Sequence, residues 1–185
     1  MERILGVVYF EVGMSPVTAL SLTILGLWTL PIGMLLLVAP SAALGVACAV
    51  RHSYCRRLAL KGLMFGVMAV FLYDCMRVPF IWFGWWGDFI PKIGGWLLAT
   101  AQPNWLVGYL YRYIGDGGFM GSAFTSIYAY FLGGMDKKRT VMSGIIFGVL
   151  IWVGLLINVV ATVRGAEMLF KLTPITEASS DFSSL

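Results

Sequence analysis

Long apolar runs alternate with short polar segments along the chain, which is the pattern of membrane-spanning helices. No Asp, Glu, Lys or Arg occurs from Val12 to Val50, and none occurs from Val141 to Val163. About 20 apolar residues cross the hydrocarbon core of a bilayer as a helix. Strands of a transmembrane β-barrel instead alternate in short segments. The pattern therefore predicts an all-α integral membrane helix bundle and excludes a β-barrel.

The apolar runs divide the chain into about five spans within a single membrane domain, residues 1–185. We expect these spans at about 5–29, 32–50, 62–80, 105–132 and 141–163, followed by a polar C-terminal tail at 164–185. A count of four stays open, because residues 4–50 also fit one span that begins at the helix-start signal Ser15-Pro16. The same choice decides whether Glu11 lies near the interface or within the membrane.

Composition and charge agree with this class of protein. Of the 185 residues, 59% are hydrophobic and 12% are charged, whereas a soluble domain carries about 25% charged residues. This excludes a water-soluble enzyme, a nucleic-acid binder and a disordered regulator. Seven of the 13 basic residues lie in two short segments, 51–61 and 135–140. The positive-inside rule predicts that both are cytoplasmic loops, with the N-terminus on the same side and the C-terminus on the opposite side.

Four charged residues fall inside predicted spans. Asp74 and Arg77 are three residues apart on one span, and Arg112 and Asp116 are four apart on another. A lone charge at the bilayer centre costs at least about 2.5–3.5 kcal/mol. Because the two spans are antiparallel, we expect the four side chains to meet at a common depth with zero net charge. Two interpretations stay open: a proton, ion or substrate site at a water-filled cavity, and a structural ion-pair network that holds the helices in register.

Three spans carry glycines four residues apart, on one helix face. Such pairs let two helix backbones approach closely in lipid, where no hydrophobic force drives helices together. We expect helix packing, within the chain or against other subunits, at Gly62 and Gly66, Gly117 and Gly121, and Gly144 and Gly148.

The connection at about 81–104 is rich in aromatic residues, and five of the seven tryptophans fall in or beside it: Trp82, Trp85, Trp86, Trp96 and Trp105. Tryptophan favours the membrane–water interface. We expect this segment to lie along the outer interface, as an aromatic belt or as a docking surface for a partner, lipid or pigment. Asp88 and Lys92 within it are expected to form a surface ion pair.

The chain offers few groups that could hold a cofactor. His52 is its only histidine, so neither a bis-histidine haem nor a two-histidine metal site can be built from one chain. Cys48, Cys55 and Cys75 have no zinc spacing, and we expect them to be free. No metal or other cofactor is predicted, and a lipid, quinone or pigment held by packing alone stays open.

Three stretches carry a resemblance to known proteins. Residues 73–80 (YDCMRVPF), the glycine-rich helix 112–130 and residues 147–152 (FGVLIW) look like those of a group of small, uncharacterised prokaryotic multi-span membrane proteins, over about residues 70–175. The resemblance implies a prokaryotic inner membrane and carries no activity. The group continues apolar beyond Leu172-Thr173-Pro174, whereas this chain ends in a polar tail.

These observations favour a non-catalytic accessory subunit of a larger membrane complex, with lipids and other membrane subunits as partners. An energy-transducing complex is one possible host. Two alternatives depend on the intramembrane charges. A small transporter or channel would need a cavity that connects water to them, and a lipid-acting enzyme would need an Asp with perturbed acidity in a pocket open to lipid.

Overall fold

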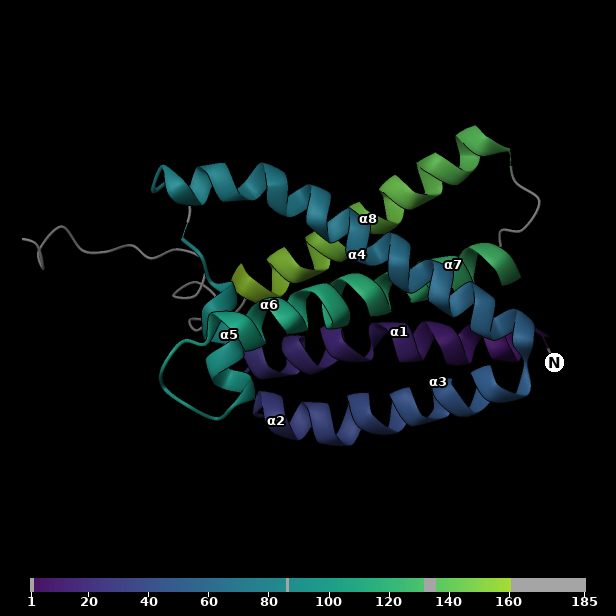
Figure 1. The fold of residues 1–185 in the computed structure, drawn as a ribbon, viewed down its shortest axis with the longest axis horizontal. Coiled ribbons are helices and arrows are strands. Elements are labelled where there is room, and N and C mark those ends of the chain that lie inside the picture. The colour runs from purple at the N-terminus through teal and green to yellow at the C-terminus, as the bar shows by residue number, and fades with distance from the viewer. Residues whose placement is uncertain (1, 86, 132–135, 161–185) are drawn as a thin grey trace, which may run out of the picture.

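The computed structural model describes residues 2–85, 87–131 and 136–160, and every regular element in these ranges is a helix (Figure 1). The helices are α1 (Glu2–Ile24), α2 (Leu30–Gly33), η1 (Met34–Val38), α3 (Ala39–Arg51), α4 (Ser53–Trp82), α5 (Ile90–Leu97), α6 (Trp105–Tyr111), η2 (Arg112–Phe119), α7 (Met120–Phe131) and α8 (Lys137–Val160). The two η segments are π-helical turns. They join their neighbours into two continuous rods, α2–η1–α3 and α6–η2–α7.

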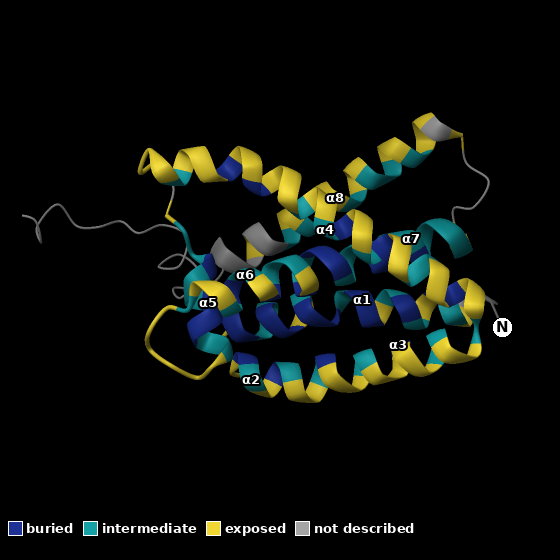
Figure 2. Ribbon diagram, viewed as in Figure 1, coloured by how far each residue is buried: buried dark blue, intermediate teal, exposed yellow. Residues whose placement is uncertain are grey.

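Three helices are long and apolar enough to cross a membrane: Ile4–Ile24, Leu30–Arg51 and Ser53–Trp82. The all-helical prediction is therefore confirmed for the described residues, and the fold is compatible with an integral membrane protein. Most large apolar side chains on α3, α4 and α8 are exposed, as Figure 2 shows. Such a surface is suited to lipid rather than to water.

The long helices run side by side in alternating directions, so the connections gather at two ends (Figure 1). The start of α1, the α3–α4 junction and the start of α8 lie at one end, which we call the basic end. The α1–α2 turn, the end of α4 and the start of α6 lie at the other, which we call the aromatic end. Both basic segments of the sequence thus lie at the same end of the bundle.

The first apolar block forms two helices, but the turn between them differs from the prediction. α1 ends at Ile24 rather than near residue 29, and the chain turns over residues 25–29. Gly26 has φ +74°, in the left-handed region that glycine adopts without steric cost. Pro31, expected in the turn, instead lies in the first turn of α2, where its missing N–H removes no hydrogen bond.

The first basic segment is helical rather than a loop. α4 starts at Ser53, nine residues before the predicted span, so that Arg56, Arg57 and Lys61 project from its first turns. Only His52, with extended backbone, separates α3 from α4. Likewise α8 begins at Lys137, ahead of the predicted start at 141. Residues 161–163 of that span and the tail 164–185 lie outside the described residues.

A short helix from the aromatic connection closes the aromatic end of the bundle. α5 buries Ile90 and Ile93 completely, and its Gly94 packs against the backbone of α6 at Gly108. The buried core at this end joins α1, α2, η1, α5 and α6 through Ala19, Leu20, Ile24, Leu30, Val38, Ile90, Ile93 and Tyr111. The connection is predicted to lie along the outer interface, with a dip into the membrane left open, and this part of it belongs to the core.

α1 accommodates an internal proline at its contact with α6. Pro16 has no N–H, and this leaves the carbonyl of Val12 without its usual helical donor. The hydroxyl of Ser15 donates to that carbonyl at 2.8 Å. The hydroxyl of Tyr111 donates to the carbonyl of Pro16 at 2.6 Å. The Ser15 bond supplies the donor that Val12 lacks within α1, and the Tyr111 bond fixes α1 against α6.

Candidate functional site

Glycines bring α4 into backbone contact with the α6–η2–α7 rod. A Cβ atom at Gly66 would overlap the carbonyl oxygen of Gly117, and one at Gly121 would overlap the carbonyl oxygen of Gly62. The structure therefore brings two of the expected glycine pairs face to face. This close approach leaves little room for side chains and sets the spacing at which the charged residues of the two helices meet.

The third glycine pair has a different environment. A Cβ at Gly144 would lie 3.4 Å from the Phe124 ring, which is an ordinary contact. A Cβ at Gly148 would meet nothing within 4 Å among the described residues. α8 touches α7 mainly through side chains, with the rings of Phe124 and Phe147 5.4 Å apart. The described bundle therefore makes no close backbone contact at Gly144 and Gly148.

Asp74 lies between the charged side chains of α4 and η2. Its Oδ1 lies 3.3 Å from Nε of Arg77 on the same helix. The same oxygen accepts hydrogen bonds from Nε and Nη2 of Arg112 on η2, both at 3.4 Å. Asp74 and Arg77 are each only 3% exposed. One carboxylate thus faces two guanidinium groups, one from each helix.

Arg112 links Asp74 to Asp116. Its Nη1 lies 3.6 Å from Oδ2 of Asp116, one helical turn further along. The guanidinium also lies 5.1 Å from the ring centroid of Tyr73, within the range of a cation–π interaction. Both Arg112 and Asp116 lie on the π-helical segment η2, and π-helical turns occur frequently at functional sites. The structure thus brings together all four charges expected to meet.

Asp88 is a fifth charged residue in this cluster, although the sequence pattern predicts that it lies at the surface. Its Oδ1 lies 3.4 Å from Nη2 of Arg77, and its Oδ2 accepts a hydrogen bond from the hydroxyl of Tyr109 at 3.0 Å. Arg77 also donates to that hydroxyl at 3.2 Å. The expectation that Asp88 pairs with Lys92 at the surface is corrected, because the carboxylate points to Arg77 instead.

A local signal could have located Asp88. It accepts a hydrogen bond from the backbone N–H of Ile90, two residues on, at 3.2 Å. This is the Asx-turn with which Asp often precedes a helix, and Pro91 in the first turn of α5 marks the same helix start. The sequence Asp-x-x-Pro thus places the Asp88 carboxylate at the start of α5, beside the end of α4.

We call Asp74, Arg77, Asp88, Arg112 and Asp116 the charge network. Three of its side-chain atoms are buried without a hydrogen-bond partner among the described residues: Asp74 Oδ2, Arg77 Nε and Asp116 Oδ1. The Nε of Arg77 is near Asp74 but is not oriented to donate. The network contains three carboxyl groups and two guanidinium groups, so the balanced quartet expected from the spans alone becomes a network with one surplus carboxyl.

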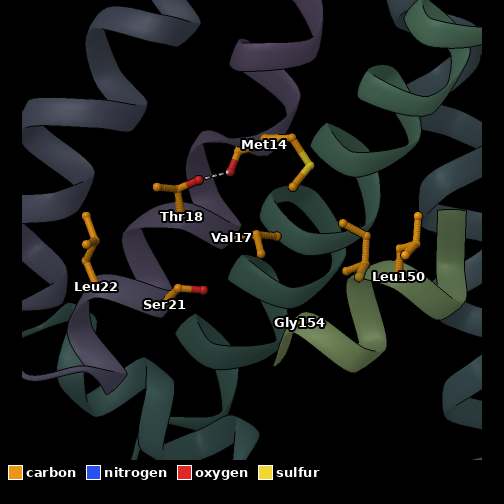
Figure 3. A pocket seen from close by; sticks show the side chains of 8 residues that line it. Met14, Val17, Thr18, Ser21, Leu22, Leu150 and Gly154 are labelled. Carbon is orange, nitrogen blue, oxygen red and sulfur yellow. Dashed lines mark hydrogen bonds between the residues drawn. The ribbon is translucent and has the colours of Figure 1, made fainter. Parts of the chain in front are cut away.

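A pocket lies in another part of the bundle, between α1 and α8 (Figure 3). Its volume is about 240 Å³, and its lining residues are Met14, Val17, Thr18, Ser21, Leu22, Leu150, Ile151 and Gly154. The hydroxyl of Thr18 donates to the carbonyl of Met14 at 3.0 Å, which leaves Ser21 as the other hydroxyl in a largely apolar lining. This pocket suits a hydrocarbon chain, and no member of the charge network lines it.

The tryptophans divide into two groups. Trp82, Trp85 and Trp105 are between 68% and 87% exposed at the aromatic end, where an interfacial belt is expected. Trp96 instead packs against the buried core. Trp86 lies outside the described residues. Trp82 ends α4, Trp85 follows it in the next turn and Trp105 begins α6, so these three lie beside the two helices that flank the charge network.

No group of three or more His, Cys, Asp or Glu that could hold a metal ion occurs in residues 2–85, 87–131 and 136–160. Within the same ranges Cys48, Cys55 and Cys75 are free thiols, and the thiol of Cys55 lies 3.0 Å from the hydroxyl of Tyr130. Comparisons of the chain with models of protein families, with curated proteins and with solved structures found no match.

Proposed function

We propose that the protein is a non-catalytic accessory subunit of a larger membrane protein complex, and that it joins this complex through α8. The observation that carries the proposal is the open environment of Gly148, where the described bundle has no atom within 4 Å of the position that a Cβ would take. Glycine inside a helix costs about 0.5–1 kcal/mol relative to alanine. A close helix from another subunit would offset this cost, as α4 does for Gly117 and Gly121.

The charge network supports a structural rather than a catalytic role. Its guanidinium groups contact carboxylates on both α4 and η2, so the network ties two helices together at one depth. An unpaired charge in the membrane interior is costly, and pairing across the interface opposes separation of the helices. The apolar pocket between α1 and the neighbouring face of α8 would hold a lipid chain.

We infer five membrane spans, in which the α6–η2–α7 rod and α8 join the three helices that are long and apolar enough to cross. The position of both basic segments at one end of the bundle supports this count. By the positive-inside rule the basic end is cytoplasmic, in a prokaryotic inner membrane, and the aromatic end faces the opposite side. The C-terminal tail then follows α8 on that opposite side.

The test compares two substitutions that each place a leucine on a helix surface. Gly148→Leu adds a side chain on the open face of α8, and Ala69→Leu enlarges one at an exposed position of α4. After extraction in a mild detergent, we expect the wild type and Ala69→Leu to migrate on native gels as a complex larger than the chain. Gly148→Leu should migrate as the isolated chain, with a Tm equal to or slightly above that of the isolated wild-type chain, because leucine favours the helix more than glycine does. Mass spectrometry then identifies the co-migrating subunits.

Two results would contradict the proposal. The first is a wild-type protein that migrates as a stable monomer in the mildest detergent that extracts it. The second is a Gly148→Leu variant that keeps the complex intact, since the leucine would then have no partner to displace. A loss of the complex in Ala69→Leu alone would move the interface from α8 to α4.

A further inference from the structure

We propose that the charge network is a proton-binding site, with the proton on Asp116. The starting point is the sum of its charges: three carboxylates and two guanidinium groups leave one negative charge in excess. An uncompensated charge in the membrane interior is costly. One proton removes it. The inference concerns the chain alone and does not depend on whether the chain has a partner subunit.

The contacts of the three carboxyl groups differ enough to say which one takes the proton. Asp74 faces two guanidinium groups, at 3.3 and 3.4 Å. Asp88 has Arg77, the Tyr109 hydroxyl and a backbone N–H as donors, and its side chain is 24% exposed. The negative charges of Asp74 and Asp88 are therefore better compensated than that of Asp116.

Asp116 is the least compensated. Its one ion pair is with Arg112 at 3.6 Å, the longest of the four in the network, and Arg112 is shared with Asp74. Its Oδ1 is buried and has no hydrogen-bond partner among the described residues. Asp74 Oδ2 is also buried without a partner, on a side chain only 5% exposed. Asp74 and Asp116 therefore share the Arg112 guanidinium, and each has one buried oxygen without a hydrogen-bond partner among the described residues. Of the two, Asp116 has the longer contact with the guanidinium, at 3.6 Å against 3.4 Å.

The other ionisable groups on the surrounding helices do not supply the missing positive charge. α4 presents Asp74 and Tyr73, whose ring lies beside Arg112. α6 presents Tyr111, which interacts electrostatically with Asp116, and η2 itself carries Tyr113, whose hydroxyl interacts with Asp74. The tyrosines of α1 and α7 direct their hydroxyls to other partners: Tyr9 to Gly45, Tyr128 to Thr140 and Tyr130 to Cys55. Glu11 on α1 is exposed. Arg112 is thus the cation on which Asp116 depends, and a proton is the simplest way to complete the balance.

The test is infrared spectroscopy of the full chain in lipid nanodiscs, with all Asp residues labelled with ¹³C at the carboxyl carbon. We expect one protonated carboxyl C=O band at neutral pH, shifted by the label. Asp116→Asn should lose this band. Asp116→Glu, which keeps a carboxyl group, should replace the labelled band with an unlabelled one. Asp88→Asn should also lose the band at neutral pH, because it removes the surplus charge while leaving Asp116 in place.

Glu11→Gln is the matched control, since Glu11 is an exposed, unlabelled acidic residue on α1 outside the charge network, and its substitution should leave the labelled band unchanged. The proposal is overturned if the wild type shows no protonated Asp carboxyl at neutral pH, if the band survives in Asp116→Asn or Asp116→Glu, or if it is unchanged in Asp88→Asn. A band that appears only when sodium ions are replaced by a bulky organic cation would also overturn it, because a metal cation would then occupy the site.

Discussion

The α6–η2–α7 rod packs extensively against α1, α4 and α5 and only lightly against α8. Two of these neighbours, α4 and α8, each bring a pair of glycines. At the α4 interface the glycines face glycines, backbone touches backbone, and ion pairs cross between the helices. At the α8 interface a phenylalanine pair makes the contact, and Gly148 faces open space. The comparison shows that two glycines four residues apart produce close helix packing where the opposite helix also has glycines at the contact. They do not produce it where the opposite helix presents a large side chain such as Phe124.

Gly66→Leu should have the largest effect on this comparison. The new side chain would overlap the carbonyl of Gly117, which is backbone and cannot move aside. We expect destabilisation of about 3 kcal/mol or more, at the upper end for overpacked cores, and loss of the monodisperse peak in size-exclusion chromatography. Gly148→Leu in the isolated chain should keep that peak, and if both variants behave alike the two interfaces do not differ as described.

Asp74→Asn should come next. It removes the anion that Arg77 and Arg112 share, but Arg77 keeps Asp88 and Arg112 keeps Asp116. We therefore expect a loss below the ~3–5 kcal/mol that an unpaired buried charge costs, seen as a fall in Tm on thermal unfolding in detergent. Adding Arg112→Gln to Asp74→Asn should recover part of the loss, because the interaction energy of the pair is then removed from both sides. Strictly additive effects of the two substitutions would show that they do not interact across the interface.

Tyr109→Phe should have a smaller effect. The phenol hydroxyl donates to Asp88 and accepts from Arg77, and a hydrogen bond to a charged group contributes about 1.5–3 kcal/mol. We expect a loss within this range, measured by thermal unfolding. Tyr54→Phe serves as the control at an exposed position and should leave Tm unchanged. Equal values for Tyr109→Phe and the control would show that Asp88 contributes nothing to the network.

Gly144→Ala should have the smallest effect, and in the opposite direction. A Cβ there meets the Phe124 ring at an ordinary contact distance, and replacing glycine by alanine in a compatible helix stabilises by about 0.4–1 kcal/mol. Tm should therefore rise slightly in the isolated chain. Gly117→Ala, which would lie 2.8 Å from the Val70 side chain, should lower it. A fall in Tm for Gly144→Ala would indicate a closer α7–α8 contact than the structure shows.

The helical class and the partners of the charge network differ in how far the sequence could predict them. Long uncharged runs predict helices directly, and antiparallel spans bring Asp74 level with Arg112 by the rise of the helix alone. The glycine pairs at Gly62 and Gly117 follow from the same periodicity. Periodicity does not indicate which face of a helix is covered by a neighbouring helix. For that reason it predicts the same packing role for Gly144 and Gly148 as for the other two glycine pairs, although their surroundings differ.

The connection between α4 and α6 is the least predictable part. Ile90, Ile93 and Leu97 follow a helical repeat, but over only eight residues. The tryptophan-rich composition around them favours the interface whether or not a segment folds back into the core. The sequence pattern therefore assigns Asp88 to the surface. The contact between Asp88 and Arg77 requires α5 to pack against α6. That packing is a tertiary contact, made possible by the close approach of Gly94 and Gly108.

The pairing of Asp74 with Arg112 also constrains how the chain is made. Each of the two helices carries an ion pair of its own, and the Asp74–Arg112 pair adds a further contact between them. The charges of each helix are therefore better compensated when the other helix is beside it than when it enters lipid alone. We therefore expect α4 and the α6–η2–α7 rod to be released into the bilayer together, as one hairpin.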